Sequence, residues 1–340
     1  MFRWILIGTG SGILVLLVAF VAFLMWPVAG YSGIPEGVSS ERFDIAVRGA
    51  ALISAGGCLS CHWDDEQGGK PFAGGKPIKT SYGTVYSSNI TPDKETGIGN
   101  WTDEDFVAAF KHGRRPDGSN LYPAFPYTAY ARLSIEEILA IKAYLFAVVK
   151  PVRAANMAAE VDFPYGWRPM LTAWKFLAID ETPLPADPGK GPAYLRGQQL
   201  VEVLGRCASC HTPTDWLGLP DRSMLLAGTA DGPGGVPVPN ITVDENTGIG
   251  RWSMQELFFY FRNGIKPNYE RAKEPMASVI NHSLKPMSNA DLLAIVAYIK
   301  EQPAISNKVT ASAVTPERPE GASPPSSVVP LSPPPGSPGG

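Results

Sequence analysis

Two stretches decide the fold of this chain: Cys58-Leu59-Ser60-Cys61-His62 and Cys207-Ala208-Ser209-Cys210-His211. In each stretch two cysteines stand three positions apart and a histidine follows directly. This spacing lets both thiols bond covalently to one haem while the histidine binds its iron. The pattern therefore predicts two covalently bound haem c groups. The predicted attachment residues are Cys58, Cys61, Cys207 and Cys210, and the predicted iron ligands are His62 and His211.

Two other uses of paired cysteines fit the sequence less well. A zinc site needs a second cysteine pair or two histidines close by, whereas 145 residues separate Cys61 from Cys207. A thiol–disulfide exchange site does not require a histidine directly after its second cysteine, and here the histidine occurs twice. The two pairs use all four cysteines of the chain, so no thiol is left for another role.

Length and charge bound the class of protein. The 340 residues are enough for two domains of ordinary size with additional segments. The formal net charge is −3, so the chain has no excess of basic residues to neutralise phosphates. We therefore expect no nucleic acid among its partners.

Residues 4–26 form a run of 23 residues without a charge. A helix rises about 1.5 Å per residue, so a helix of this length spans a hydrocarbon core of about 30 Å. The alternative is a cleaved signal peptide, whose apolar part is only about 7–15 residues long. Arg3 precedes the run and Glu36 follows it, which places the N-terminus in the cytoplasm. The sequence predicts a transmembrane anchor over residues 1–30 in the bacterial inner membrane, with the haem domains in the periplasm.

The chain contains an internal repeat. The loop from Asn89 to Trp101 returns from Asn240 to Trp252, 151 positions later, and 11 of 25 positions are identical when both copies are extended to their next glycine. A period of this length indicates a duplicated domain rather than a solenoid. We expect cytochrome domains over residues 42–150 and 191–302, a linker over residues 151–190, and a disordered Pro-rich tail over residues 303–340.

Both copies are predicted to contain the same helices in the same order. The helices that lead into the cysteine motifs are expected at residues 48–57 and 196–206. Capping boxes predict the next helices, and similar signals open the closing ones. These signals lie at Thr102–Asp105 and Ser253–Glu256, and at Ser134–Glu137 and Ser288–Asp291.

The segments between these helices carry weaker signals. Residues 64–88 and 212–239 are rich in Gly and Pro, so we expect them to lack regular structure and to wrap the haem. The Asn89 and Asn240 sequons occupy matching places in the repeat, which favours a role in loop geometry over glycosylation. Within the linker, residues 163–168 and 174–177 are apolar enough to pack between the two domains.

A second axial ligand is needed where a haem iron cycles electrons with little rearrangement, and methionine is the usual choice in cytochromes c. The second copy offers Met276, in a Pro-containing loop before the closing helix, and Met287, at the start of that helix. His282 is a third candidate. We favour Met276 because Met287 is more simply explained by packing.

The first copy breaks this pattern. Phe125 stands at the position that corresponds to Met276, and no methionine lies between His62 and Met157. The first iron is therefore expected to be five-coordinate or to take a ligand from elsewhere in the chain. The spare side chains are His112, Met157 and Met170, each of which packing also explains.

The loop from Asn89 to Trp101, the segment from Asp117 to Tyr127 and the stretch from Cys207 to Pro213 resemble one family in particular. They are similar to the membrane-anchored cytochrome c subunits of periplasmic alcohol, aldehyde and gluconate dehydrogenases, over about residues 42–302. Members of that family typically carry three Cys-x-x-Cys-His motifs and a methionine where Phe125 stands. This chain has two such motifs and a Pro-rich tail in place of a third domain.

The resemblance implies an all-α fold, with two tandem class I cytochrome c-like domains behind the N-terminal transmembrane helix. It also implies that the haem-holding residues are Cys58, Cys61, His62, Cys207, Cys210, His211 and Met276. In that family the cytochrome accepts electrons from a catalytic subunit that carries pyrroloquinoline quinone, flavin or a molybdenum cofactor. It passes them to ubiquinone or onward to an oxidase.

Our leading hypothesis is electron transfer without catalytic residues of the chain's own. A di-haem c-type cytochrome would carry electrons from a dehydrogenase catalytic subunit to the respiratory chain, through a quinone or a downstream oxidase or cytochrome. One alternative is a di-haem peroxidase-like enzyme that uses an open first haem beside Phe125. The other is the di-haem subunit of a terminal oxidase.

Overall fold

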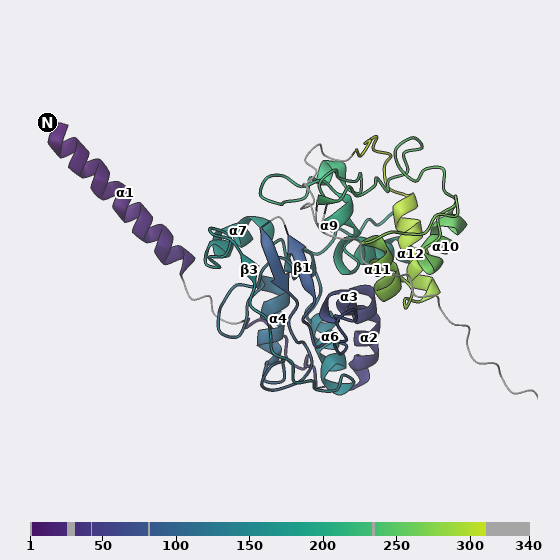
Figure 1. Cartoon of the computed structure of the whole chain (residues 1–340), viewed down its shortest axis with the longest axis horizontal. Helices are drawn as coiled ribbons and strands as arrows, with labels where there is room; N and C mark the ends of the chain where they lie inside the picture. Colours follow the sequence, from purple (N-terminus) through teal and green to yellow (C-terminus); the bar gives the residue numbers. More distant parts are fainter. Residues whose placement is uncertain (1, 26–30, 42, 81, 233–234, 311–340) are drawn as a thin grey trace, which may run out of the picture.

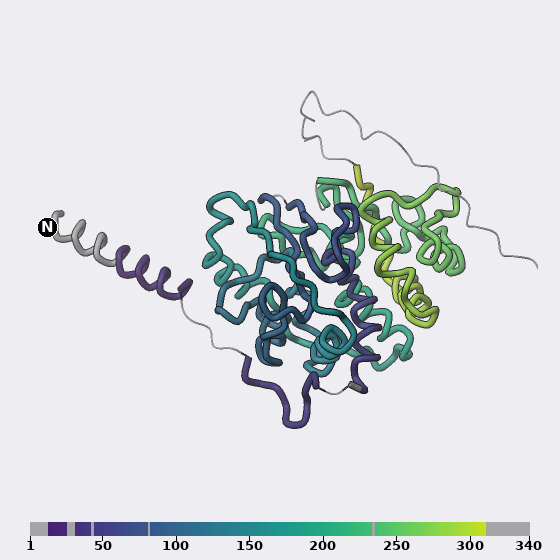
Figure 2. The backbone as a smooth tube through the Cα atoms, turned by 60° about the horizontal axis from the view of Figure 1, so that its bottom comes forward, coloured from purple at the N-terminus to yellow at the C-terminus, as the bar shows by residue number. Residues whose placement is uncertain are grey.

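The computed structural model describes residues 2–25, 31–41, 43–80, 82–232 and 235–310, and it describes side chains in the first helix from Ile13 onward. Helix α1 (Phe2–Leu24) lies apart from the rest of the chain in Figure 1. Beyond it, two modules of similar build lie side by side (Figure 2). The linker segment between the modules carries a short strand and helix α7 (Met170–Ala178).

The first module contains most of the strands. Its elements in chain order are η1 (Phe43–Ile45), α2 (Ala46–Ala55), α3 (Cys58–His62), β1 (Pro77–Thr80), β2 (Gly83–Tyr86), α4 (Asp103–His112), α5 (Tyr127–Tyr130) and α6 (Ile135–Ala147). Strand β3 (Glu160–Val161) follows in the linker.

The second module repeats the helical order of the first. Its elements are α8 (Pro192–Gln198), the π-helix η2 (Gln199–Leu204), α9 (Cys207–His211), the 3₁₀ turn η3 (Arg222–Met224), α10 (Met254–Asn263), α11 (Met276–Val279), the π-helix η5 (Ile280–Leu284) and α12 (Asn289–Lys300).

The predicted helix starts are confirmed by their caps. The side chains of Thr102, Ser134 and Ser253 each accept a hydrogen bond from the backbone three residues later, and the acidic residue there closes the capping box. Ser288 accepts from the backbone amide of Asp291 in the same way. These caps satisfy amides that the first helical turn leaves without partners.

In each module the first and last helices cross at a glycine. A Cβ atom added to Gly49 on α2 would lie 2.0 Å from the carbonyl oxygen of Ala140 on α6. A Cβ atom added to Gly197 on α8 would lie 2.0 Å from the carbonyl oxygen of Ala294 on α12. The two helix backbones are therefore in direct contact at each crossing, which only glycine permits.

The expectation of an all-α fold is wrong in one respect, because the chain also carries a small antiparallel sheet of order β1-β2-β3. Ile78 on β1 pairs with Val85 on β2, and Gly83 on β2 pairs with Val161 on β3. The expectation that residues 64–88 lack regular structure is wrong for the same reason. Ile78 and Thr80 in β1 and Thr84, Val85 and Tyr86 in β2 have high strand propensity and favour a hairpin, despite the surrounding Gly and Pro.

The loops that carry the sequons are fixed by their own side chains. The Asn89 side-chain amide donates to the carbonyl of Val152 at 2.7 Å, and the Asn240 side-chain amide donates to the carbonyl of Ile305 at 2.7 Å. Both asparagines are buried. Each loop thus holds the chain segment that follows its module's last helix, which agrees with a role in loop geometry.

This pairing corrects the prediction for the tail. Residues 303–310 are not disordered, because the Asn307 side chain donates to the carbonyl of Ala227 at 2.9 Å and its backbone amide donates to Thr247 Oγ1 at 3.0 Å. Residues 311–340, the rest of the predicted tail, lie outside the described residues.

The linker contacts both modules through Trp174 and Lys175 of the expected segment 174–177. Lys175 Nζ on α7 donates to the carbonyl of Gly113, and Trp174 Nε1 donates to the carbonyl of Leu217 at 2.8 Å. Phe163 and Phe176, predicted to pack between the modules, are instead 86% and 81% exposed.

Helix α1 contacts the linker at its C-terminal end. Thr172 Oγ1 on α7 donates to the carbonyl of Leu24 at 3.4 Å, and Leu24 is buried. Among the residues that the structure describes, no helix has the length and apolar character needed to cross a membrane. The anchor over residues 1–30, part of which lies outside the described residues, stays a prediction.

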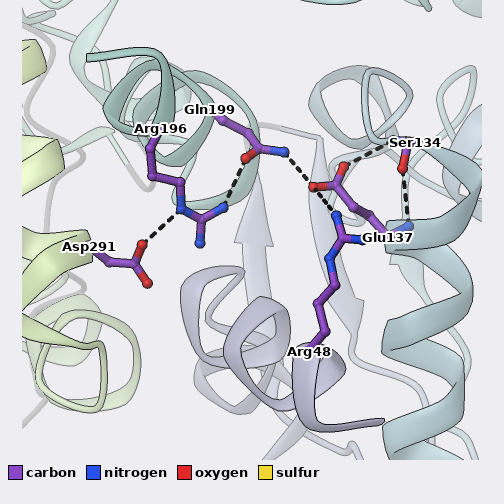
Figure 3. A network of polar contacts seen from close by, with 6 residues as sticks. All are labelled: Arg48, Ser134, Glu137, Arg196, Gln199 and Asp291. Carbon is purple, nitrogen blue, oxygen red and sulfur yellow. Dashed lines mark hydrogen bonds and ion pairs between the residues drawn. The ribbon is translucent and has the colours of Figure 1, made fainter. Parts of the chain in front are cut away.

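The two modules share one continuous apolar core, joined by the two π-helices of the second module. Helix η5 contacts α2 and α3 of the first module, and η2 contacts α2 and α5. A polar network runs beside this core (Figure 3). In it, Gln199 Nε2 donates to Glu137 Oε1 at 2.6 Å across the interface, while Arg196 donates to Gln199 Oε1 at 2.9 Å.

Candidate functional site

The first Cys-x-x-Cys-His motif opens onto an apolar cavity. Cys58, Cys61 and His62 form the short helix α3, which starts after Gly57 in a left-handed conformation (φ 59°). All three residues line a cavity that encloses about 1320 Å³, part of it open to solvent. The other walls come from α2, the sheet, α4 and α6, with side chains that include Leu52, Ile78, Val85, Phe110 and Ile141. These walls suit a flat, largely apolar macrocycle bonded to the two cysteines.

Both motif histidines are oriented by a backbone carbonyl. The Nδ1 atom of His62 lies 2.7 Å from the carbonyl oxygen of Ser88, and the Nδ1 atom of His211 lies 2.8 Å from that of Pro239. A carbonyl only accepts hydrogen bonds, so each Nδ1 carries the proton and each Nε2 keeps a free lone pair. This is how proteins orient a histidine that binds a metal.

Burial keeps these groups uncharged. It lowers the pKa of His62 and of His211. Burial also raises the pKa of the Cys58 and Cys207 thiols to about 12, and it raises the pKa of Cys210. Reactive cysteines in exchange motifs have lowered pKa values instead.

The donor set favours haem over a bare metal ion. The four cysteines form no disulfide. Within the described parts of the chain, no three His, Cys, Asp or Glu side chains gather closely enough to hold a metal ion by themselves. Each motif thus offers two thiols and one histidine nitrogen, and the residues present fit covalent haem at both places.

The candidates for a second axial ligand in the second module occupy different surroundings. Met276 begins α11, is partly buried and packs against the core. Met287 is 5% exposed and belongs to the core. His282 is engaged with Ser278 at 3.2 Å and faces Asp65 of the first module at 3.9 Å. These surroundings agree with our preference for Met276, whose ligation stays a prediction.

In the first module, Phe125 lines the cavity and packs against Phe110 and Tyr130, with ring centroids 5.1 and 5.7 Å apart. His112 points elsewhere, because its Nε2 lies 3.2 Å from a carboxylate oxygen of Glu181.

Met157 is the residue that our reading of the sequence undervalued. It lies in the linker and lines the first cavity. Hydrogen bonds between the Asn89–Trp101 loop and the backbone of Val152 and Ala154 hold the linker against the first module, directly before Met157 in the chain. The Asn-Ile-Thr loop occurs in both copies and holds the segment that follows the last helix of each module. The repeat of this loop was the sequence signal that could have indicated that the linker returns to the cavity.

Comparisons with known proteins find cytochrome c subunits, which agrees with the two haem-binding motifs. No protein-family model matches the chain. It is 42% identical over 271 residues to the fructose dehydrogenase cytochrome subunit of Gluconobacter japonicus, covering 79% of this chain and 55% of that protein. It is 38% identical over 261 residues to the gluconate 2-dehydrogenase cytochrome c subunit of Pantoea cypripedii, covering 74% and 58%. The chain thus spans somewhat more than half the length of these two relatives.

A third relative matches along almost its whole length. The chain is 35% identical over 300 residues to a diheme cytochrome c-type protein of Cereibacter sphaeroides, which covers 87% of this chain and 98% of that protein. The two Cys-x-x-Cys-His motifs of this chain agree with the two haems in that name.

Proposed function

This chain belongs to the family of diheme c-type cytochromes, and we propose that it carries electrons from the catalytic subunit of a dehydrogenase complex to an acceptor of the respiratory chain. The observation that supports this most is the duplicated site. Two short helices each present two thiols and one carbonyl-oriented histidine. A haem at each site supplies one-electron chemistry between Fe(III) and Fe(II) when bound.

The chain's own residues would hold, orient and shield the two groups. Cys58 and Cys61 bond to the first haem, and Cys207 and Cys210 to the second. His62 and His211 would bind the two irons, with their rings held by the carbonyls of Ser88 and Pro239. Met276 would supply a further ligand to the second iron, and Met157 is the methionine that lines the first cavity.

The proposed electron donor follows from the relatives. Several of them are named as cytochrome subunits of fructose, gluconate and alcohol dehydrogenases. We propose a dehydrogenase catalytic subunit as the partner of this chain, with a quinone or a downstream oxidase or cytochrome as the acceptor. The chain itself would carry out no substrate chemistry.

The proposed location rests on the sequence. Covalent haem is attached outside the cytoplasmic membrane, and the uncharged run from Trp4 to Trp26 is long enough for a span. We propose that the haem domains lie in the bacterial periplasm and that residues 1–30 tether them to the inner membrane.

Mass and spectra test the haem content. The purified chain should exceed its bare mass by two haems and should show reduced c-type absorption bands. Neither site should consume peroxide if Met157, which lines the first cavity, binds the first iron. Rapid peroxide turnover would favour the peroxidase alternative, and a colourless chain would refute both.

Electron transfer is tested by mixing. The oxidised cytochrome is mixed with a fructose, gluconate or alcohol dehydrogenase catalytic subunit and with that enzyme's substrate. We expect both haems to become reduced, as followed by absorbance. Absence of reduction with an active dehydrogenase would contradict the proposed partnership.

A further inference from the structure

Arg206 precedes Cys207 and corresponds in the repeat to Gly57, which precedes Cys58. Both residues start the motif helix in the left-handed conformation, with φ values of 53° for Arg206 and 59° for Gly57. Glycine adopts this conformation freely, whereas a long side chain is strained there. The second module therefore has an arginine at a position where glycine would adopt the same backbone conformation with less strain.

The side chain of Arg206 leaves its own module. It lines the cavity that holds Cys58, Cys61 and His62. Its Nη2 atom donates to the carbonyl of Gly56 at 3.4 Å, and its guanidinium lies 5.6 Å from the ring centre of Tyr130. The Tyr130 hydroxyl donates to the same carbonyl at 3.0 Å. Two residues of the first module thus hold a cation that belongs to the second.

This cation is partly buried, and among the described residues no carboxylate pairs with it. Its Nε atom is buried and has no hydrogen-bond partner. The groups that act on it electrostatically are Tyr130 and the thiols of Cys61, Cys210 and Cys58, none of which is a carboxylate. A guanidinium stays charged at every ordinary pH, and burying a charge without a partner is costly. The charge therefore acts on cysteines of both motifs from a site with little water.

We propose that Arg206 is an electrostatic positioning residue, whose fixed positive charge favours the reduced state of the haem attached at Cys58 and Cys61 and so raises its reduction potential. The inference rests on the proposed function. Reduction adds one electron from an external donor and makes the site one unit less positive, and no proton is needed for the effect. A nearby cation stabilises the form with less positive charge. The inference concerns the first haem, because the guanidinium lines the first cavity.

Three substitutions separate charge from packing. Arg206→Gly reproduces the first module and relieves the strained backbone, so it should fold. Arg206→Met keeps the length of the stem without the charge, and Arg206→Lys keeps the charge. The control is Arg222→Gln, because Arg222 is a 58% exposed arginine of the same module that pairs with Glu202.

The measurement is a redox titration of the full haem-loaded chain, followed by visible absorption. The two transitions are assigned with Met157→Ala, because Met157 lines the first cavity. We expect Arg206→Gly and Arg206→Met to lower the reduction equilibrium constant of the first haem about tenfold, which is 59 mV for one electron. Arg206→Lys should keep most of the original potential, and Arg222→Gln should leave both transitions in place.

Two results would overturn the inference. The first is an unchanged first transition in Arg206→Gly and Arg206→Met. The second is an equal shift in the Met and Lys variants, which would mean that packing and not charge sets the potential. Failure of the proposed function looks different, because the unmodified chain would then lack haem or would not accept electrons from the dehydrogenase.

Discussion

The glycine crossing in the second module allows a stability prediction worked from distances. In Gly197→Ala the new methyl group would lie 2.0 Å from the carbonyl oxygen of Ala294 and 2.7 Å from Tyr298 Cβ. Carbon contacts are comfortable at about 3.5 Å, so α8 and α12 must separate by roughly 1 Å or more. Such overpacking costs about 3 kcal/mol when the obstacle is backbone that cannot rotate away.

A second effect opposes this cost. Alanine favours a helix interior over glycine by about 1 kcal/mol. We therefore expect Gly197→Ala to lower the free energy of unfolding by about 2 kcal/mol. Gly49→Ala should behave alike, because its methyl group would meet the carbonyl oxygen of Ala140 at the same 2.0 Å.

The assay is urea unfolding of the haem-loaded chain, followed by far-UV circular dichroism. Gly191→Ala is the matched control, because Gly191 precedes α8 with a φ of −74° and nothing lies within 4 Å of an added Cβ. The control should change stability by no more than about 0.5 kcal/mol. If Gly197→Ala were instead about 1 kcal/mol more stable than the unmodified chain, the two helix backbones would not be in contact.

Three further predictions concern the axial ligands and the interface. Met157→Ala should make the first haem high-spin and able to bind carbon monoxide, and an unchanged spectrum would exclude Met157 as a ligand. Met276→Ala should lower the reduction potential of the second haem, because a methionine ligand raises it; an unshifted potential in a redox titration would point to another ligand. Gln199→Ala should cost about 1.5 kcal/mol in urea unfolding, because Glu137 loses a hydrogen bond of 2.6 Å. The neighbouring Gln198→Ala, whose side chain makes only a 3.4 Å contact, is the control and should cost less.

Local signals predicted most of the helical framework. Thr102, Ser134 and Ser253 cap their helices as expected, because an N-cap depends only on residues within one turn. The Cys-x-x-Cys-His pattern likewise fixes which side chains share one short helix, since its spacing is about one helical turn. These features could be predicted because every atom involved lies within five residues of sequence.

The rest depended on contacts between distant segments. Strand β3 joins the sheet from the linker, and its pairing with Gly83 could not be read from two residues of sequence. Met157 reaches the first cavity because Val152 and Ala154 are held by the Asn89 loop, more than 55 residues earlier in the chain. The role of Arg206 was missed as well, because its side chain acts in the module to which it does not belong.

The differences between the two copies explain how a duplicated domain became an asymmetric pair. Gly49 and Gly197 are 148 positions apart, whereas Cys58 and Cys207 are 149 apart. The second copy therefore carries one extra residue before its motif, and the π-helix η2 lies there, as an inserted residue in a helix would produce. Three more residues separate Met276 from Ser288 than separate Phe125 from Ser134, and the π-helix η5 lies in that interval.

Both of these π-helices contact the first module. Ser283 on η5 donates to the carbonyl of Ala55 at 3.2 Å, and η2 ends two residues before Arg206. The insertions therefore give the second copy a surface that the first copy does not have. Because Leu204 and Arg206 of the second module line one side of the first haem cavity, the first site includes side chains that the other copy contributes. A difference in reduction potential between the two haems then follows from the position of the insertions, even before their axial ligands are compared.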